Sequence, residues 1–249
     1  MTFKPKVLRY ESLPSTNTEV ARLATLGAPE GLTVIADEQT AGRGRLQRKW
    51  QSPRDAGLYF STLLRPTFRP DKWSLITFMA ALAVSDALHE AFEIETDIKW
   101  PNDLLSGERK LCGILAEAIE TELGRAVVLG IGVNLTNDAY PLELAGVATS
   151  VSEANARRPE RESLVGALLQ AIARWYSLLS DLDGPDKIVA AWSSRSSYAT
   201  GKTVKVINGE EVWEGVTRGV ESDGALRLEV DSSIRLIRAG DVVSVRAAV

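Results

Sequence analysis

Two nearly uninterrupted apolar runs lie close together in the middle of the chain, at residues 110–119 and 126–135. Apolar runs of this length are typical of strands that are covered on both faces. The two runs therefore predict central strands of a β-sheet. Shorter runs rich in β-branched and aromatic residues predict further strands, at residues 7–12, 31–38, 58–66 and 96–100.

Helical patterns separate the predicted strands. Apolar residues recur at helical spacing over residues 74–92 and 162–182, and again around 187–195. A shorter helix is predicted to begin at a capping box formed by Thr16 and Glu19. Helices and strands mixed in this way predict an α+β fold, in which a mixed sheet is packed with helices.

The pattern changes after about residue 198, where short alternating strands follow one another without helices. Asn-Gly, Asp-Gly and Ala-Gly-Asp turns join them, which favours a small β-barrel. We therefore expect two domains, residues 1–197 and 198–249. The predicted strands are 203–207, 211–220, 225–230, 233–240 and 242–246.

Charge and composition exclude several classes of function. The net charge is −4, so bulk electrostatics give no reason to expect nucleic-acid or membrane binding. The single cysteine, Cys112, allows no disulfide within the chain, which suits a reducing cytoplasm. With one histidine, His89, the chain also lacks a Cys/His metal cluster. No signal-peptide core opens the sequence, and no stretch approaches the ~18 consecutive apolar residues of a membrane span.

Five polar or glycine-rich segments stand out against this background. The longest is a loop without apolar period, and a long ordered loop in a compact domain is more often functional than idle. The segments are STN (15–17), DEQTAGRGRLQRKW (37–50), KWPNDLL (99–105), KLCGILAE (110–117) and GIGVNL (130–135).

Taken singly, each segment has an ordinary structural interpretation. A Gly-x-Gly loop is commonly a flexible turn, and Lys99 or Lys110 alone would be a solvated lysine at a strand edge. Asn102 and Asp103 alone would form a turn or helix cap after a proline. Asn134 would cap a strand end, and Trp50 would anchor the loop.

In this order, however, the segments resemble the biotin–protein ligase family, the group of the biotin operon repressor/ligase and holocarboxylase synthetase. GRGR followed by tryptophan (42–50), KWPND (99–103) and KLCGIL (110–115) carry most of the resemblance. It covers residues 10–180, and the strands containing GALRLE and AGDVVSVR are similar to that family's small SH3-like domain. The resemblance implies a class II synthetase-like catalytic domain followed by an SH3-like barrel.

The same resemblance implies an activity. Members of the family activate biotin with ATP to biotinyl-5'-AMP and pass the biotin to a lysine of a biotin carboxyl carrier protein. The mixed anhydride is itself an activated acyl group, so the enzyme needs placement and charge stabilisation rather than a nucleophilic side chain. The lack of a candidate Cys or His nucleophile is consistent with this chemistry.

The resemblance also assigns residues to the biotin ring. The ureido group is neutral, with two N–H donors and a carbonyl acceptor, so it requires short polar side chains. Ser15, Thr16, Asn17 and Gln39 match the family positions that hold it. Trp50 and the apolar strands would pack the thiophane ring, the valeryl chain and adenine, and the strand residues that approach the ligand are Gly113, Gly132 and Asn134.

Biotin and ATP are both anions, so the site must supply positive charge around the α-phosphate. Arg43 and Arg45 alternate with glycines, which let the backbone come close while the guanidinium groups grip oxygen anions. Lys110 matches the family's main ligand-contacting lysine, and Lys99 is a second cation. The remaining candidates are Gly42 and Gly44 in the loop, Asn102 for the nucleotide and Asp103 as a ligand of Mg²⁺.

Two departures from the family pattern matter. The first ligase strand begins near residue 7, so we expect the monofunctional type, without the DNA-binding winged helix-turn-helix and without DNA as a partner. The loop reads Leu46-Gln47 where the family more often has Arg-Gly or Leu-Gly, which lowers backbone freedom there. The resemblance further implies a homodimer, formed either with or without bound ligand.

Three other functions compete with this interpretation. A lipoate or octanoate transferase shares the general fold, but the GRGR loop, KWPND and the small carboxy-terminal barrel argue against it. A biotin- or nucleotide-binding regulator would not need both loop arginines and Lys110. A nucleic-acid module is disfavoured by the acidic net charge.

Overall fold

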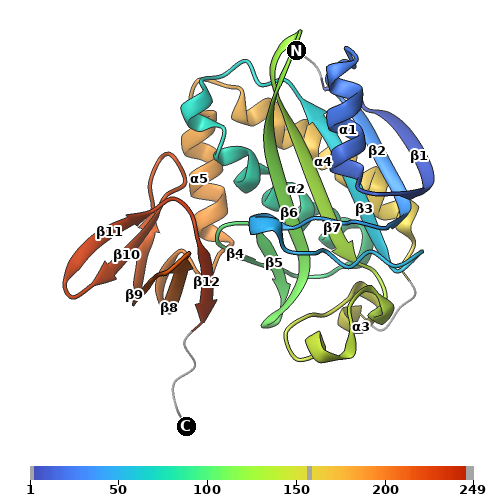
Figure 1. The fold of residues 1–249 in the computed structure, drawn as a ribbon. Coiled ribbons are helices and arrows are strands. Elements are labelled where there is room, and N and C mark those ends of the chain that lie inside the picture. Colours follow the sequence, from blue (N-terminus) through green and yellow to red (C-terminus); the bar gives the residue numbers. More distant parts are fainter. Residues whose placement is uncertain (1–2, 156–158, 245–249) are drawn as a thin grey trace.

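The computed structural model describes residues 3–155 and 159–244, and a seven-stranded mixed sheet forms its larger part (Figure 1). The strand order is β1-β2-β3-β7-β6-β5-β4. β1 and β2 pair in parallel, and the remaining neighbours pair antiparallel. The strands are β1 (Lys6–Leu13), β2 (Leu32–Gln39), β3 (Gly57–Leu64), β4 (Asp97–Lys99), β5 (Asp103–Ser106), β6 (Arg109–Thr121) and β7 (Gly124–Asn134).

The prediction of two central strands is confirmed. β7 lies at the middle of the sheet between β3 and β6, and both β6 and β7 come from the long apolar runs. β3 is buried along its whole length, because helices cover the sheet on both faces. The α+β prediction, a mixed sheet packed with helices, is therefore correct.

Helices divide between the two faces of the sheet (Figure 1). α1 (Thr16–Thr25) lies on one face, where Val20 and Ala24 form a small core with residues of β2, β3 and β7. The main core lies on the other face, under α2 (Leu75–Phe92), α4 (Arg161–Leu179) and α5 (Gly184–Ser194). A short helix, α3 (Val151–Asn155), and four 3₁₀ turns complete this part: Arg45–Gln47, Pro70–Lys72, Asn137–Ala139 and Leu142–Leu144.

One local prediction was wrong, and one short strand was missed. The capping box does not form: Ser15 is the N-cap without a side-chain cap bond, and the Glu19 carboxylate instead accepts hydrogen bonds from Tyr10 and Arg22. The segment after Pro101 is not only a turn, because Asp103 begins the four-residue strand β5. Four residues are too short for a periodicity to reveal a strand.

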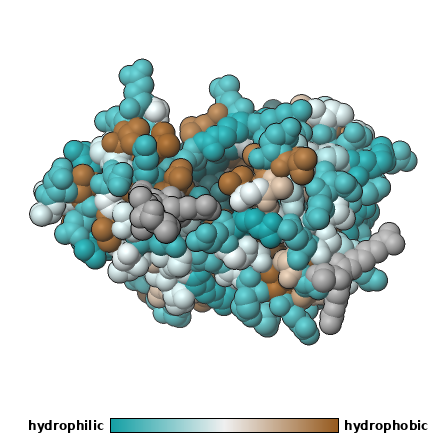
Figure 2. All heavy atoms as spheres, turned by 90° about the horizontal axis from the view of Figure 1, so that it is seen from below, coloured by the Kyte–Doolittle hydropathy of each residue, from teal (hydrophilic) through white to brown (hydrophobic). Residues whose placement is uncertain are grey.

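α2 is long and apolar enough to cross a membrane by length and composition, although Asp86, His89 and Glu90 interrupt its apolar residues. In the fold, 61% of this helix is buried, and its buried residues belong to the main core. A helix between a sheet and two other helices is apolar around most of its surface. Figure 2 shows a largely hydrophilic face of the molecule, on which apolar residues form small separate patches.

The carboxy-terminal segment forms a second, antiparallel five-stranded sheet beside the first (Figure 1). Its order is β11-β10-β9-β8-β12, as expected for a small SH3-like domain. Trp100 Nε1 donates to the carbonyl of Gly224 (3.0 Å), and Ser74 Oγ donates to that of Asp223 (2.6 Å), which docks this sheet against the first domain. The strands are β8 (Thr200–Asn208), β9 (Glu211–Val220), β10 (Leu226–Val230), β11 (Ser233–Ile237) and β12 (Asp241–Ser244); residues 245–246 of the predicted last strand lie outside the described residues.

Asp86 on α2 links three helices. Its carboxylate accepts hydrogen bonds from Arg195 (2.5 Å), Arg174 (2.6 Å) and Trp175 (2.7 Å), and its side chain is only 21% exposed. Burial raises the pKa of Asp86, but the three hydrogen bonds together outweigh burial, so the pKa lies below its ordinary value. A carboxylate with a lowered pKa stabilises the fold above its unfolded pKa of about 4, and this contribution is lost as the pH falls through the folded value.

Asp86→Asn should therefore lower the free energy of unfolding by about 2 kcal/mol at pH 7, because two guanidinium groups lose their partner. Urea unfolding at pH 7 and at pH 3 measures the effect. The difference in unfolding free energy between variant and wild type should narrow at pH 3, because the carboxylate of the unfolded wild-type chain is then largely protonated and part of the linked stability is lost. Asp183→Asn, in an exposed pair with Lys187, is the matched control and should not differ measurably. An equal difference in unfolding free energy between variant and wild type at both pH values would contradict a lowered pKa of Asp86.

Candidate functional site

A cavity of about 390 Å³ opens on the face of the sheet that carries α1. This volume lies in the range of sites for small molecules and cofactors. The wall combines the first turn of α1, the loop after β2, parts of β5 to β7, the segment 139–148 and one residue of the second sheet. The predicted site residues in this wall are Ser15, Thr16, Asn17, Gln39, Arg43, Gly44, Arg45, Trp50, Asn102, Asp103, Lys110, Gly113, Gly132 and Asn134.

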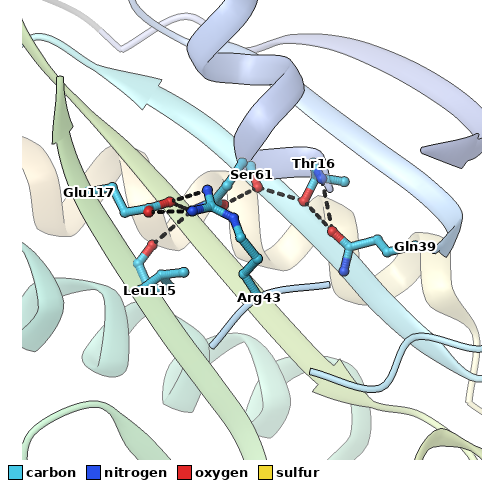
Figure 3. Close-up of polar contacts among 7 residues, drawn as sticks. Thr16, Gln39, Arg43, Ser61, Leu115 and Glu117 are labelled. Carbon is cyan, nitrogen blue, oxygen red and sulfur yellow. Dashed lines mark hydrogen bonds and ion pairs between the residues drawn. The ribbon is translucent and has the colours of Figure 1, made fainter. Parts of the chain in front are cut away.

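A continuous series of polar contacts joins three of the predicted ring-binding residues, Thr16, Asn17 and Gln39 (Figure 3). Gln39 Oε1 accepts hydrogen bonds from the backbone N–H of Thr16 (2.8 Å) and from its hydroxyl (3.1 Å). Ser61 Oγ lies 2.7 Å from Thr16 Oγ1 and 2.6 Å from Asn17 Oδ1. Asn17 Nδ2 donates to Glu117 (2.7 Å). The series thus runs from the end of β2 through α1 and β3 to β6.

The loop arginines are each held by partners from distant parts of the chain. Arg43 donates two parallel hydrogen bonds to the carboxylate of Glu117, at 3.0 and 2.9 Å. Arg45 donates to Asn102 Oδ1 (3.2 Å) and lies 3.8 Å from the carboxylate of Asp241 in the second domain. Arg48 also pairs with Asp241. Burial has the largest effect on the pKa of Arg45 and lowers it. The nearby Asp103 raises this pKa and Arg48 lowers it, so that it lies below the ordinary value for arginine.

Lys110 lies at the start of β6, with its Nζ 2.6 Å from Asp103 and 5.4 Å from the centroid of the Trp50 ring. Its side chain is 34% exposed and belongs to the cavity wall. With the two arginines, it brings three cations to one cavity. Cations that are partly withdrawn from water attract an anionic ligand more strongly than solvated ones.

Trp50 lies flat against two glycines of the sheet. A Cβ atom at Gly132 would come within 2.6 Å of the indole, and one at Gly113 within 2.9 Å. Both glycines therefore leave the space that this ring occupies. The indole N–H is buried against the sheet and has no hydrogen-bond partner among the described residues.

Three predicted residues take other positions or roles in the structure. Lys99 is not in the cavity wall, and its Nζ lies 5.8 Å from the centroid of the Tyr198 ring. Burial has the largest influence on its pKa and keeps that pKa below the ordinary value for lysine. Gly42 is also outside the wall; a Cβ there would approach the Trp50 carbonyl to 2.5 Å, so it permits the loop to fold back on itself. Asn134 donates to the carbonyl of Thr149 (2.9 Å) and so ties β7 to the segment that borders the cavity.

Sequence reasoning missed Glu117, Ser61 and Asp241. Glu117 stands inside the segment KLCGILAE and is polar on a central strand, which was a usable signal. Ser61 gave a weaker signal, as a small polar residue on the fully buried strand β3. Asp241 gave none, because its contact with the loop exists only once the two domains have docked.

Leu46 and Gln47 both adopt left-handed backbone conformations, with φ of 53° and 59°. Left-handed backbone costs a residue with a Cβ roughly 1–2 kcal/mol. The tip of the loop is therefore strained at Leu46 and at Gln47, and glycine, which the family pattern has in place of Gln47, would remove the strain at either position.

Gln47→Gly should make the loop open less often. Relief of about 1 kcal/mol of strain would lower the population of the open loop about fivefold. The greater chain entropy of glycine in the open loop would reduce this factor. The rate of tryptic cleavage after Arg45 and Arg48 under native conditions measures this population. Gln51→Gly, whose φ is not positive, is the control and should leave cleavage unchanged or accelerate it. Faster cleavage in Gln47→Gly would show that chain entropy outweighs the strain.

Comparisons with known proteins agree on one family. A family model described as "Biotin/lipoate A/B protein ligase family" matches residues 10–134, and one described as "Biotin protein ligase C terminal domain" matches residues 200–244. The bifunctional ligase/repressor BirA of Bacillus subtilis is 36% identical over 242 residues, which cover 95% of this chain and 73% of that protein. The biotin–[acetyl-CoA-carboxylase] ligase of Paracoccus denitrificans is 36% identical over 235 residues, covering 92% of this chain and 96% of that protein. The structure of biotin protein ligase from Aquifex aeolicus in complex with biotin and ATP superimposes with a TM-score of 0.84 at 29% identity, over 98% of this chain and 100% of that one.

Proposed function

The chain belongs to the biotin/lipoate A/B protein ligase family, and we propose that it activates biotin with ATP and transfers the biotin to a lysine of a carrier protein. One observation carries the proposal. The cavity wall combines neutral hydrogen-bonding side chains around Thr16 and Gln39 with the three cations Arg43, Arg45 and Lys110. A ligand that has a neutral polar ring and an anionic end fits this combination.

The reaction has two steps. A carboxylate oxygen of biotin attacks the α-phosphorus of ATP, and pyrophosphate leaves, which gives biotinyl-5'-AMP. The uncharged amine of the acceptor lysine then attacks the acyl carbon, and AMP leaves with the bonding electrons. Negative charge gathers on the α-phosphate in both steps, where Lys110, Arg43 and Arg45 would stabilise it. Trp50 and the loop would cover the anhydride and keep water away.

The polar groups around Thr16 and Gln39 would select the ring. Their buried donors and acceptors match the ureido group, whereas the dithiolane ring of lipoate has no N–H or carbonyl. Lipoate would leave these protein groups unpaired, which discriminates strongly. Ser15, Thr16, Asn17 and Gln39 therefore keep their proposed role as ring-binding residues.

Mg²⁺ would enter with ATP as part of the substrate. Among the residues that the structure describes, no group of three or more His, Cys, Asp or Glu side chains could hold a metal by itself. Mg²⁺ beside nucleotides commonly needs only one or two carboxylates and takes its other ligands from phosphates and water. Asp103 in the cavity wall fits this minimal requirement, although its present partner is Lys110.

The proposed roles of the remaining residues follow from their positions. Asn102 lies beside Arg45 and would contact the nucleotide. Gly113 and Gly132 make room for Trp50, and Gly42 and Gly44 allow the loop to approach the phosphates. Lys99 would act only at a distance, as a cation on the strand next to Asp103.

Incubation with ATP, Mg²⁺, biotin and a biotin carboxyl carrier domain, followed by intact mass measurement, tests the proposal. We expect the mass of one biotin on the carrier, and none on a carrier whose acceptor lysine is replaced by arginine. Pyrophosphate exchange with biotin and with lipoate separates this function from a lipoate or octanoate transferase. No mass gain on a carrier that another ligase modifies would overturn the proposal, and turnover with lipoate alone would favour the alternative.

We further propose that the protein works in the cytoplasm and without DNA, and that residues 1–197 and 198–249 are its two domains. The net charge of −4 and the single cysteine support the first two points.

A homodimer is also part of the proposal, by analogy with the family. We expect light scattering to report twice the monomer mass of 27.1 kDa when biotin and ATP are present. A monomer mass at every protein concentration, with and without ligand, would refute it.

A further inference from the structure

Glu117 stands where the ring-binding residues meet the loop. Its carboxylate accepts two hydrogen bonds from Arg43 (3.0 and 2.9 Å), as Figure 3 shows. It accepts a third from Asn17 Nδ2 (2.7 Å). Glu117 is not part of the cavity wall. Any effect it has on a ligand must therefore pass through its partners.

Glu117 determines which way the Asn17 amide points. A carboxylate in such a pair only accepts hydrogen bonds, and the second neighbour of Asn17 Nδ2, the carbonyl of Leu115 (3.4 Å), also only accepts. The NH₂ group must face these two acceptors, so Oδ1 faces Ser61. A Cβ at Gly130 would come within 2.1 Å of this oxygen, so the amide fills its space closely.

The orientation of Asn17 in turn sets the hydroxyl proton of Ser61. Ser61 Oγ lies within hydrogen-bond distance of both Asn17 Oδ1 and Thr16 Oγ1, but a hydroxyl has only one proton. Because Oδ1 cannot donate, the proton of Ser61 goes to Asn17. Thr16 Oγ1, 2.7 Å from Ser61 Oγ, also lies 3.1 Å from Gln39 Oε1, so the series reaches both of these ring-binding residues. All three side chains are buried, so bulk water does not replace these bonds.

We propose that Glu117 is a positioning residue that fixes the orientation of the Asn17 amide, and with it the hydrogen-bonded series of the ring pocket, for the ureido group of biotin. The inference rests on the proposed function, because biotin is its ligand. It also joins recognition of the ring to the loop, since the same carboxylate holds Arg43.

An exchange of one atom should disturb the series. Glu117 Oε2 accepts hydrogen bonds from both Arg43 and Asn17, and Oε1 accepts one from Arg43. In Glu117→Gln, one of these oxygens becomes an NH₂ group that cannot accept, so at least one donor loses its partner. The remaining amide oxygen is uncharged and holds its donors less strongly, so the Asn17 amide is fixed less firmly.

The test compares Glu117→Gln with Glu120→Gln, a matched change on the same strand in an exposed pair with Arg125. Calorimetric titration with biotin alone should show about tenfold or greater weakening for Glu117→Gln, as expected when a buried polar group loses its partner. In pyrophosphate exchange, the KM for biotin should rise by the same factor, and the KM for ATP should change less than about twofold. Glu120→Gln should match wild type in both measurements.

A double-mutant cycle separates positioning from general damage. In an Asn17→Ala background, Glu117→Gln should weaken biotin binding less than about twofold, because the series is already broken. If Asn17→Ala does not fold, Ser61→Ala provides the same background. An equal factor in both backgrounds, or unchanged binding by Glu117→Gln itself, would overturn the inference alone. Failure of the wild-type protein to bind biotin would overturn the proposed function and this inference together.

Discussion

Lys110→Ala is expected to fold normally and to lose biotin-dependent pyrophosphate exchange by about 10²-fold or more, as for removal of one preorganised charge. Lys110 Nζ lies in the cavity wall beside Asp103 and Trp50. Removal of the side chain spares the backbone bonds of this residue, which join it to Val147 (2.8 Å) and Thr149 (2.9 Å). The loss should therefore appear in kcat for adenylate formation and not in the melting temperature.

Lys99→Ala is the matched control for this prediction. Both lysines are near Asp103, but Lys99 lies outside the cavity wall. A charge that acts at a distance is worth much less than one in direct contact with the ligand, so we expect a loss below about tenfold. Equal losses of activity in the two variants would mean that Lys110 acts through the electrostatic field of the site and not through direct contact with the ligand. Full activity of Lys110→Ala would exclude it from the chemistry.

Arg45→Gly should release biotinyl-5'-AMP before the carrier arrives. Arg45 connects the loop to Asn102 (3.2 Å), to the Gly240 carbonyl (3.3 Å) and to Asp241 (3.8 Å), so it fastens the loop to both domains. Loss of these contacts, and of a guanidinium for the phosphate, should speed release of the adenylate by tenfold or more, roughly the effect of one charge-assisted hydrogen bond. The free adenylate would then acylate lysines of bystander proteins.

Two measurements check this expectation. Labelling of serum albumin with biotin should rise in Arg45→Gly and stay at background in Arg54→Gly, a control whose side chain pairs with Glu38 outside the cavity. Trypsin should cut wild type after Arg43, Arg45 or Arg48 more slowly once biotin and ATP are added, and this protection should weaken in Arg45→Gly. If wild type resists trypsin equally with and without ligand, the loop is fixed and does not close on the intermediate. Unchanged albumin labelling would mean that Arg45 does not retain the adenylate.

The sequence alone was sufficient for the central strands and the carboxy-terminal sheet. Residues 110–119 and 126–135 could be assigned because a strand covered on both faces must be apolar at nearly every position, whatever its neighbours are. The short strands after residue 198 could be assigned because alternation and Asn-Gly or Asp-Gly turns act over a few residues. The five segments could also be found from the sequence, since their residue types and their order along the chain are local information.

Tertiary structure decided where local signals had competing partners. Thr16 and Glu19 have the spacing of a capping box, but the Thr16 hydroxyl contacts Gln39 and Ser61, which lie on β2 and β3. Such contacts depend on the register between strands, which the spacing of two residues on one helix does not contain. β5 was missed for a related reason, because its four residues become a strand only through pairing with β4 and β6.

The same distinction holds within the site. Arg43, Arg45 and Lys110 were recognisable as cations in a glycine-rich or apolar setting, so their chemistry could be predicted from the sequence. Their partners could not, because Glu117 is 74 residues from Arg43 and Asp241 comes from another domain. The sequence determined which charges and hydrogen-bonding groups are present, and the fold decided which of them are neutralised, because a side chain's partner depends on distances that exist only after the sheet and the two domains have packed.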